Sequence, residues 1–74
     1  MAKDIRVNYA KRLRALRKKH GYTQQRLAEC ANVEYKHIQR LESKKPCDVK
    51  LSTLEKIAKA FKIPISKLLD FNDT

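Results

Sequence analysis

The chain has 74 residues and a formal net charge of +10 at pH 7, because 18 lysines and arginines face 8 aspartates and glutamates. A chain this short holds one small core, so we expect residues 1–74 to form a single domain with no room for a separate sensor or catalytic domain. The surplus of positive charge indicates a polyanionic partner.

The first segment carries one helical stripe of apolar residues among basic ones: Ile5, Tyr9, Leu13 and Leu16. This spacing predicts an amphipathic helix that Gly21 ends. Its start is open from the sequence. Asp4 is a suitable N-cap, but the helix could also begin nearer Asn8, with residues 1–7 as a flexible arm.

The stretch from Gln24 to Ser43 contains two short helical patterns separated by a turn. In its first half Leu27, Ala28 and Ala31 share one narrow face, and their small size lets a second helix cross closely. Asn32 then stands where the chain must reverse. Asparagine tolerates a left-handed backbone, so this residue predicts the end of one helix and the start of the turn.

In the second half of this stretch, Val33 is the apolar residue between the two helices, and Ile38 and Leu41 recur three residues apart. We expect all three to face the core. The opposite, outward side of the second helix then carries polar and aromatic residues: Glu34, Tyr35, Lys36, Gln39 and Arg40.

The apolar and turn residues of this stretch match a known pattern: Leu27, Ala28, Ala31, Asn32, Val33, Ile38 and Leu41. At these offsets the chain resembles the helix-turn-helix regulators of the Cro and lambda-repressor family, the xenobiotic-response-element class. The resemblance covers about residues 9–71, with Asn32 in place of the usual glycine and Glu34 in place of the usual serine or threonine cap. It implies an all-α, compact five-helix DNA-binding domain.

By this resemblance, the helix from about Glu34 to Ser43 reads double-stranded DNA, and five of its residues face base edges: Glu34, Tyr35, Lys36, Gln39 and Arg40. The side chains suit that task, since lysine and arginine donate to guanine, glutamate accepts from cytosine and glutamine can bridge adenine. A polar helix face is ordinarily only solvated. Here the motif fixes the face outward, which favours the DNA-binding interpretation.

A second set of residues is expected to contact phosphates: Arg17, Thr23, Gln24, Gln25, Lys44, Lys45 and Lys50. Thr23 is a good N-cap, and the first turn that follows it carries free amide groups with partial positive charge. Gln24 matches the phosphate-clamping glutamine of the resembled family. Arg17 has two interpretations, since the resemblance also implies that it pairs with Glu42 across the domain.

The last third of the chain predicts two more helices. Ser52 and Glu55 have the spacing of a capping box, and a helical stripe follows: Leu54, Ile57, Ala58 and Phe61. Pro64 then starts a short last helix. Its apolar residues either complete the core, chiefly through Ile63, Ile65 and Leu68, or form a twofold dimer patch: Pro64, Ile65, Leu69 and Phe71.

The function expected from these features is a sequence-specific transcriptional regulator that occupies a palindromic operator as a homodimer. Two copies would place their half-sites about 34 Å apart, one turn of duplex. The sequence does not separate a phage-type repressor, a controller of a restriction-modification operon and the antitoxin of a toxin-antitoxin pair. A basic structural protein that coats nucleic acid without sequence preference is the alternative from another class.

Other classes of function are disfavoured. The sequence has no paired carboxylates, no nucleophile with a matching base and no glycine-rich phosphate loop, so we expect no enzyme, no cofactor and no small-molecule effector. Cys30, Cys47, His20 and His37 do not have the spacing of a metal site. No apolar run is long enough to cross a bilayer and no secretory signal is visible, so a cytoplasmic location is expected.

Overall fold

Five helices follow one another in the computed structural model, which describes residues 4–71: α1 (Ile5–Lys19), α2 (Gln24–Ala31), α3 (Tyr35–Leu41), α4 (Leu51–Phe61) and α5 (Ile65–Leu68). No strand occurs within that range. The all-α, five-helix prediction is therefore confirmed.

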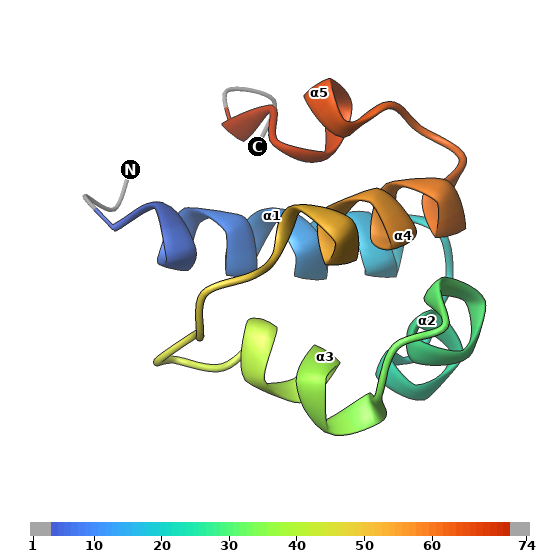
Figure 1. Cartoon of the computed structure of the whole chain (residues 1–74), viewed down its shortest axis with the longest axis horizontal. Coiled ribbons are helices and arrows are strands. Elements are labelled where there is room, and N and C mark those ends of the chain that lie inside the picture. The colour runs from blue at the N-terminus through green and yellow to red at the C-terminus, as the bar shows by residue number, and fades with distance from the viewer. Residues whose placement is uncertain (1–3, 72–74) are drawn as a thin grey trace.

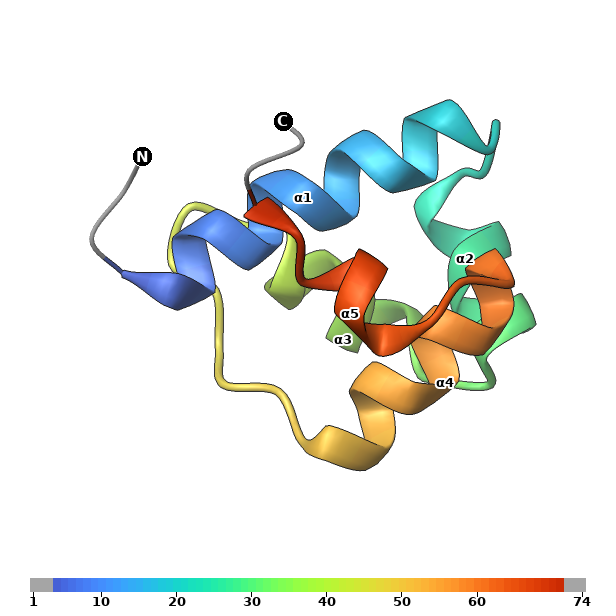
Figure 2. The same cartoon turned by 90° about the horizontal axis from the view of Figure 1, so that it is seen from above.

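The helices are stacked in three tiers (Figure 1). Helices α1 and α4 form the middle tier, α2 and α3 lie on one side of it, and α5 lies on the other. Seen along the stack, α5 crosses between α1 and α4, with α3 beneath them (Figure 2). Helix α3 thus occupies one outer side of the molecule, and the carboxyl-terminal helix occupies the opposite side.

The core draws apolar side chains from all five helices: Tyr9, Leu13, Leu16, Leu27, Ala28, Ala31, Ile38, Leu41, Leu54, Ile57, Ala58, Phe61 and Leu68. The apolar stripes predicted for α2, α3 and α4 are confirmed. Val33 packs against the core between α2 and α3. Ile5 is the exception in the first stripe, because its side chain is 65% exposed. It lies in the first turn of α1, which extends beyond α3 in Figure 1.

The start of α1 is set by Asp4. Its carboxylate accepts a hydrogen bond of 2.9 Å from the backbone N–H of Arg6 and two more from the Arg6 guanidinium. These hydrogen bonds hold the pKa of the Asp4 carboxyl below its usual range. The helix therefore begins at Ile5 rather than near Asn8, so residues 5–7 are helical and not part of an arm. Residues 1–3 lie outside the described range.

Within residues 4–71, three residues with positive φ end helices or make turns. Gly21 (φ 71°) follows α1, and Asn32 (φ 56°) ends α2, as the sequence predicted for both. The third, Lys62 (φ 58°), ends α4, and its backbone N–H donates to carbonyls of the last turn. Lysine is an uncommon residue in this conformation, so nothing in the sequence indicated it.

The start of α4 corrects the predicted capping box. The helix begins at Leu51, one residue before Ser52, and its N-cap is Lys50, whose side chain makes no capping hydrogen bond. Ser52 therefore lies inside the first turn and cannot act as the N-cap. By contrast, Thr23 caps α2 as predicted, since its hydroxyl oxygen accepts a 3.0 Å hydrogen bond from the backbone N–H of Arg26.

This difference between the two caps gives a matched test. Thr23→Ala removes an acceptor at the start of α2 and is expected to lower the free energy of unfolding by about 1 kcal/mol. In a domain of this size, that corresponds to a Tm lower by about 4–8 °C in thermal denaturation followed by circular dichroism. Ser52→Ala is the control and should change stability by no more than about 0.5 kcal/mol. Equal losses in both variants would contradict the assignment of the caps.

The last helix is held to the first by Arg12, whose guanidinium donates a 2.8 Å hydrogen bond to the carbonyl of Lys67. Arg12 is buried, which its place among exposed basic residues did not indicate. Leu68 is fully buried, and Ile63, Leu69 and Phe71 pack partly against the core. The expectation that Ile65 completes the core is wrong, because its side chain remains 37% exposed.

Candidate nucleic-acid interface

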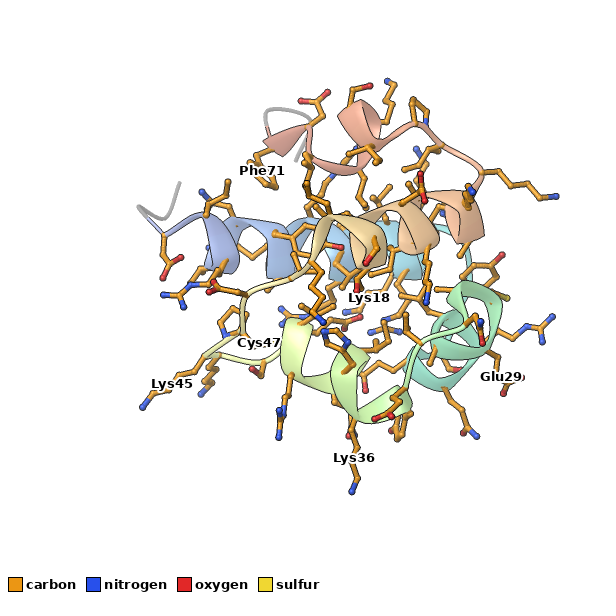
Figure 3. All side chains as sticks on the ribbon, in the orientation of Figure 1. Lys18, Glu29, Lys36, Lys45, Cys47 and Phe71 are labelled. Carbon is orange, nitrogen blue, oxygen red and sulfur yellow. The ribbon has the colours of Figure 1, made fainter. Side chains whose placement is uncertain are left out.

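Helix α3 presents a polar outer face that nothing else in the described part of the chain covers. Ile38 and Leu41 are fully buried beneath it. The residues predicted to read bases are all exposed: Glu34, Tyr35, Lys36, Gln39 and Arg40. Figure 3 shows Lys36 pointing directly away from the body of the molecule. Among residues 4–71, the side chains of these five make no hydrogen bond or ion pair with the protein.

The end of α3 is anchored by Glu42, which is buried although it is charged. Its carboxylate accepts hydrogen bonds of 2.8 and 3.1 Å from the Arg17 guanidinium and one of 3.3 Å from the Gln24 side-chain amide. The Arg14 guanidinium donates to the backbone carbonyl of Glu42. The buried acid thus joins α1, α2 and the end of α3, and the Arg17–Glu42 pair implied by the resemblance is confirmed.

Tyr9 on α1 has a buried hydroxyl without a hydrogen-bond partner. Burial, with a smaller contribution from the negative charge of Glu42, raises the pKa of the Tyr9 hydroxyl. Tyr9 therefore stays neutral and acts as a core residue. Helix α3 is therefore held in two places: Ile38 and Leu41 pack its apolar face into the core, and the Arg17–Glu42 ion pair fixes its carboxyl end.

Two donors of the Arg17 guanidinium are used by the ion pair with Glu42. A third donor of its guanidinium bonds the carbonyl of Tyr22 at 2.9 Å, and the side chain is only 14% exposed. Its structural role is thereby established, and a phosphate contact by the same side chain stays a prediction. Gln24 is half-buried with its amide turned toward Glu42, whereas Thr23 and Gln25 are exposed at the start of α2. The Thr23 hydroxyl accepts from the backbone, so its own hydrogen is available to a phosphate.

The loop that leaves α3 carries exposed cations up to Lys50, the N-cap of α4. Lys44, Lys45 and Lys50 are exposed, and the described part of the chain supplies none of them with a carboxylate partner. Lys45 points outward on the α3 side of the molecule (Figure 3). These lysines differ from Arg6 and Arg26, which pair with Asp4 and Glu29. Unpaired cations beside an uncovered polar helix form a surface suited to a polyanion.

Two hollows flank α3, and the second contains a residue that the sequence analysis missed. One lies toward α2 and is bordered by Gln25, Glu29 and Tyr35, among others. The other is lined by Glu34, Lys36, His37, Arg40 and Cys47. His37 is half-buried in its wall. Since it lies three residues before Arg40, helical spacing alone could have placed it beside that residue.

The described residues offer little for other chemistry. Within residues 4–71, no three His, Cys, Asp or Glu side chains come together as a metal site, and Cys30 and Cys47 are free thiols. None of the described helices combines the length and the apolar character needed to cross a membrane.

Comparison with known proteins identifies the class of the interface. A family model of the Cro/C1-type HTH DNA-binding domain matches residues 12–74. The chain belongs to this family. Its α2 and α3 are accordingly the two helices of a helix-turn-helix, and the chain is a DNA-binding transcriptional regulator. The resemblance drawn from the sequence is confirmed.

Two solved structures share the fold of this Cro/C1-type domain. The restriction-modification controller protein C.AhdI from Aeromonas hydrophila is 28% identical, with a TM-score of 0.80 over 85% of this chain and 94% of its own. The hypothetical transcription factor NHTF from Neisseria is also 28% identical, with a TM-score of 0.82 over 90% of this chain and 74% of its own. A search of curated proteins gave no significant match.

Proposed function

We propose that this Cro/C1-type regulator binds a palindromic operator in double-stranded DNA as a homodimer and controls transcription by occupying it in the cytoplasm. The observation that carries the proposal is the outer face of α3, whose exposed side chains have no partner in the described protein while the helix itself is anchored by Ile38, Leu41 and Glu42. A rigid helix with free donors and acceptors can enter a major groove without first breaking contacts of its own.

In this proposal the contacts divide into two sets. Glu34, Tyr35, Lys36, Gln39 and Arg40 face base edges and supply sequence preference. The phosphate contacts come from the start of α2, from the loop after α3 and from the end of α1: Arg17, Thr23, Gln24, Gln25, Lys44, Lys45 and Lys50. The unpaired lysines supply affinity that does not depend on sequence, and the exposed Thr23 hydroxyl and Gln25 amide, with the half-buried Gln24, fix the register of the helix on the duplex.

The biological setting follows the solved relatives. One of them is named a restriction-modification controller protein and another a hypothetical transcription factor. We therefore favour a restriction-modification controller or a phage-type repressor over the antitoxin of a toxin-antitoxin pair. The proposal needs no small-molecule effector, because occupancy can be set by the concentration of the protein.

Selection of bound sequences from a random duplex pool at physiological salt tests the proposal. We expect an enriched motif with twofold symmetry. In binding assays on that motif, Arg40→Ala and Lys36→Ala should each weaken binding roughly tenfold to hundredfold per half-site, because a donor to a base edge is lost. Lys59→Ala, an exposed lysine on α4, is the matched control and should bind like the wild type.

The same selection distinguishes this proposal from the competing function, a basic protein that coats nucleic acid without sequence preference. A protein that coats nucleic acid without preference would enrich no motif and would bind random duplex or RNA as tightly as any selected site. Such a result, or full binding by the Arg40 and Lys36 variants, would rule out base recognition by α3.

The dimer is proposed to form through the carboxyl-terminal side, at Pro64, Ile65, Leu69 and Phe71. Pro64 and Ile65 are exposed, whereas Leu69 and Phe71 already pack partly against the core of their own protomer. This side is opposite α3 in Figure 1, so a partner there would leave the DNA-facing helix uncovered. Ile65 is the member of the patch that can be changed with the least damage to the fold.

Ile65→Glu is therefore expected to yield a monomer in sedimentation at micromolar concentration, where the wild type sediments as a dimer. A charge placed inside an apolar contact between protomers must be desolvated without a partner. Leu51→Glu is the control, since Leu51 is 80% exposed at the start of α4 and lies outside the patch. A wild type that stays monomeric both with and without its selected DNA would remove the dimer from the proposal.

A further inference from the structure

Glu34 is an isolated negative charge on the side of α3 that faces away from the core. It is the exposed N-cap residue of α3, and its side chain makes no capping hydrogen bond. The other acids of the stretch 24–43 are both paired, Glu29 with Arg26 and Glu42 with Arg17. Across residues 4–71, no cation or donor approaches the Glu34 carboxylate closely enough to pair with it.

The free carboxylate of Glu34 lies within the proposed DNA-binding surface, not at its edge. Glu34 lines both hollows beside α3, with Tyr35 in one and with Lys36 and Arg40 in the other. It is therefore at the centre of the surface that binds DNA in the proposed function. A carboxylate brought close to duplex DNA is repelled by the phosphates, so it must find a hydrogen-bond donor or weaken binding.

Few groups on duplex DNA can donate to it. In the major groove the donors are the N4 amino group of cytosine and the N6 amino group of adenine. Beside the adenine amino group lies N7, an acceptor that would face the lone pairs of the carboxylate, which has no hydrogen to offer it. The cytosine amino group has its own C5–H on one side and O6 of the paired guanine on the other, whereas the adenine amino group lies between two acceptors, its own N7 and O4 of the paired thymine. Cytosine is therefore the base that donates to a carboxylate with fewer opposing acceptors.

Two cations of the same helix suit the guanine that pairs with this cytosine. Lys36 and Arg40 lie with Glu34 around one hollow, and both are free to donate to guanine O6 and N7. A C·G pair offers a donor on one base and acceptors on the other. We propose that Glu34 is a specificity-determining residue and that each half-site of the operator contains a C·G pair whose cytosine amino group donates to its carboxylate. This inference rests on the function proposed above.

The test uses the motif selected by the wild-type protein. Each cytosine of one half-site is replaced in turn by N4-methylcytosine, which removes the amino hydrogen that faces the groove, and each C·G pair by T·A, which puts the O4 acceptor of thymine there. At one position both changes should weaken wild-type binding roughly tenfold to hundredfold. Glu34→Ala should bind the original and the changed sites equally well, and a selection with this variant should lose its preference at that position alone.

Glu29→Ala is the matched control, because it also removes one exposed negative charge from the helix-turn-helix but should keep every base preference. Glu34→Ala should change the Tm little, since the Glu34 side chain makes no hydrogen bond or ion pair with the described protein. Three results would overturn the inference: Glu34→Ala binding all sequences more tightly by the same factor, the variant keeping the wild-type preference for cytosine, or a wild-type motif with no cytosine sensitive to N4 methylation. If the wild type enriches no motif at all, the proposed function itself fails.

Discussion

Replacing Glu42 by alanine is expected to lower the free energy of unfolding by about 3 to 5 kcal/mol, the cost of breaking a buried ion pair from one side. Glu42 is 4% exposed and accepts from Arg17 at 2.8 Å. Without it, the Arg17 guanidinium would remain in the interior with only the carbonyl of Tyr22 as partner, and the Gln24 amide would lose its acceptor. In a domain of this length each kcal/mol lowers Tm by about 4–8 °C, so the variant should be largely unfolded well below the melting range of the wild type.

Urea denaturation followed by circular dichroism measures this loss, with Arg17→Met as the companion variant. Glu29→Ala is the control, because Glu29 makes a 3.7 Å ion pair with Arg26 in which both side chains are more than half exposed. Such a surface pair contributes at most about 1 kcal/mol. Equal stability of the Glu42, Arg17 and Glu29 variants would show that the buried group does not hold α3 in place.

The fold was predictable where local chemistry and apolar spacing agree. The caps at Asp4 and Thr23 act through hydrogen bonds within a few residues, and Asn32 is one of the few residue types that adopt a left-handed backbone. The inward faces of α3 and α4 followed from apolar residues at helical spacing. These features depend on residues a few positions apart, so the sequence predicted them, except that it left the start of α1 open between Asp4 and Asn8.

The features that were missed depend on contacts distant in sequence. Arg12 is buried because the end of α5 packs over α1 and supplies the carbonyl of Lys67, 55 residues away. Ser52 looked like a cap, but the helix starts one residue earlier, at Leu51. Ile65 has the apolar character of a core residue but lies on the exposed side of a short helix. Tertiary packing, rather than local preference, settles the placement of Arg12 and Ile65.

The predicted interface also contains features that local spacing indicated and features that depend on residues distant in sequence. Exposure of the outer face of α3 followed from the positions of Ile38 and Leu41, since a helix with one buried face must present the other. The arrangement around Arg17 could only be implied by the resemblance, because Glu42 is 25 residues away. His37 was overlooked, although it lines a hollow with Lys36 and Arg40. Which of these side chains contact DNA stays a prediction.

The affinity of the proposed dimer for its operator should fall steeply with salt. Each protomer carries three unpaired lysines in the loop after α3, Lys44, Lys45 and Lys50, so a dimer in which these lysines alone meet phosphates neutralises about six of them. Displacing the counterions of six phosphates gives a plot of log K against log salt with a slope of about −5. Raising the salt from about 50 to about 200 mM should then weaken binding roughly a thousandfold.

Fluorescence anisotropy across a salt series measures this slope and also tests the individual contacts. Lys44→Ala should reduce the slope by about 2, one unit per protomer, while Lys59→Ala on α4 should leave it unchanged. A slope near −7 would mean that a fourth cation per protomer neutralises a phosphate, as the proposed contact of Arg17 requires, since each such cation adds about 2 to the slope of the dimer. A slope near zero would contradict the role assigned to the lysine loop. The number of phosphates neutralised thus tests whether the three loop lysines act alone or are joined by a fourth cation, the role proposed for Arg17.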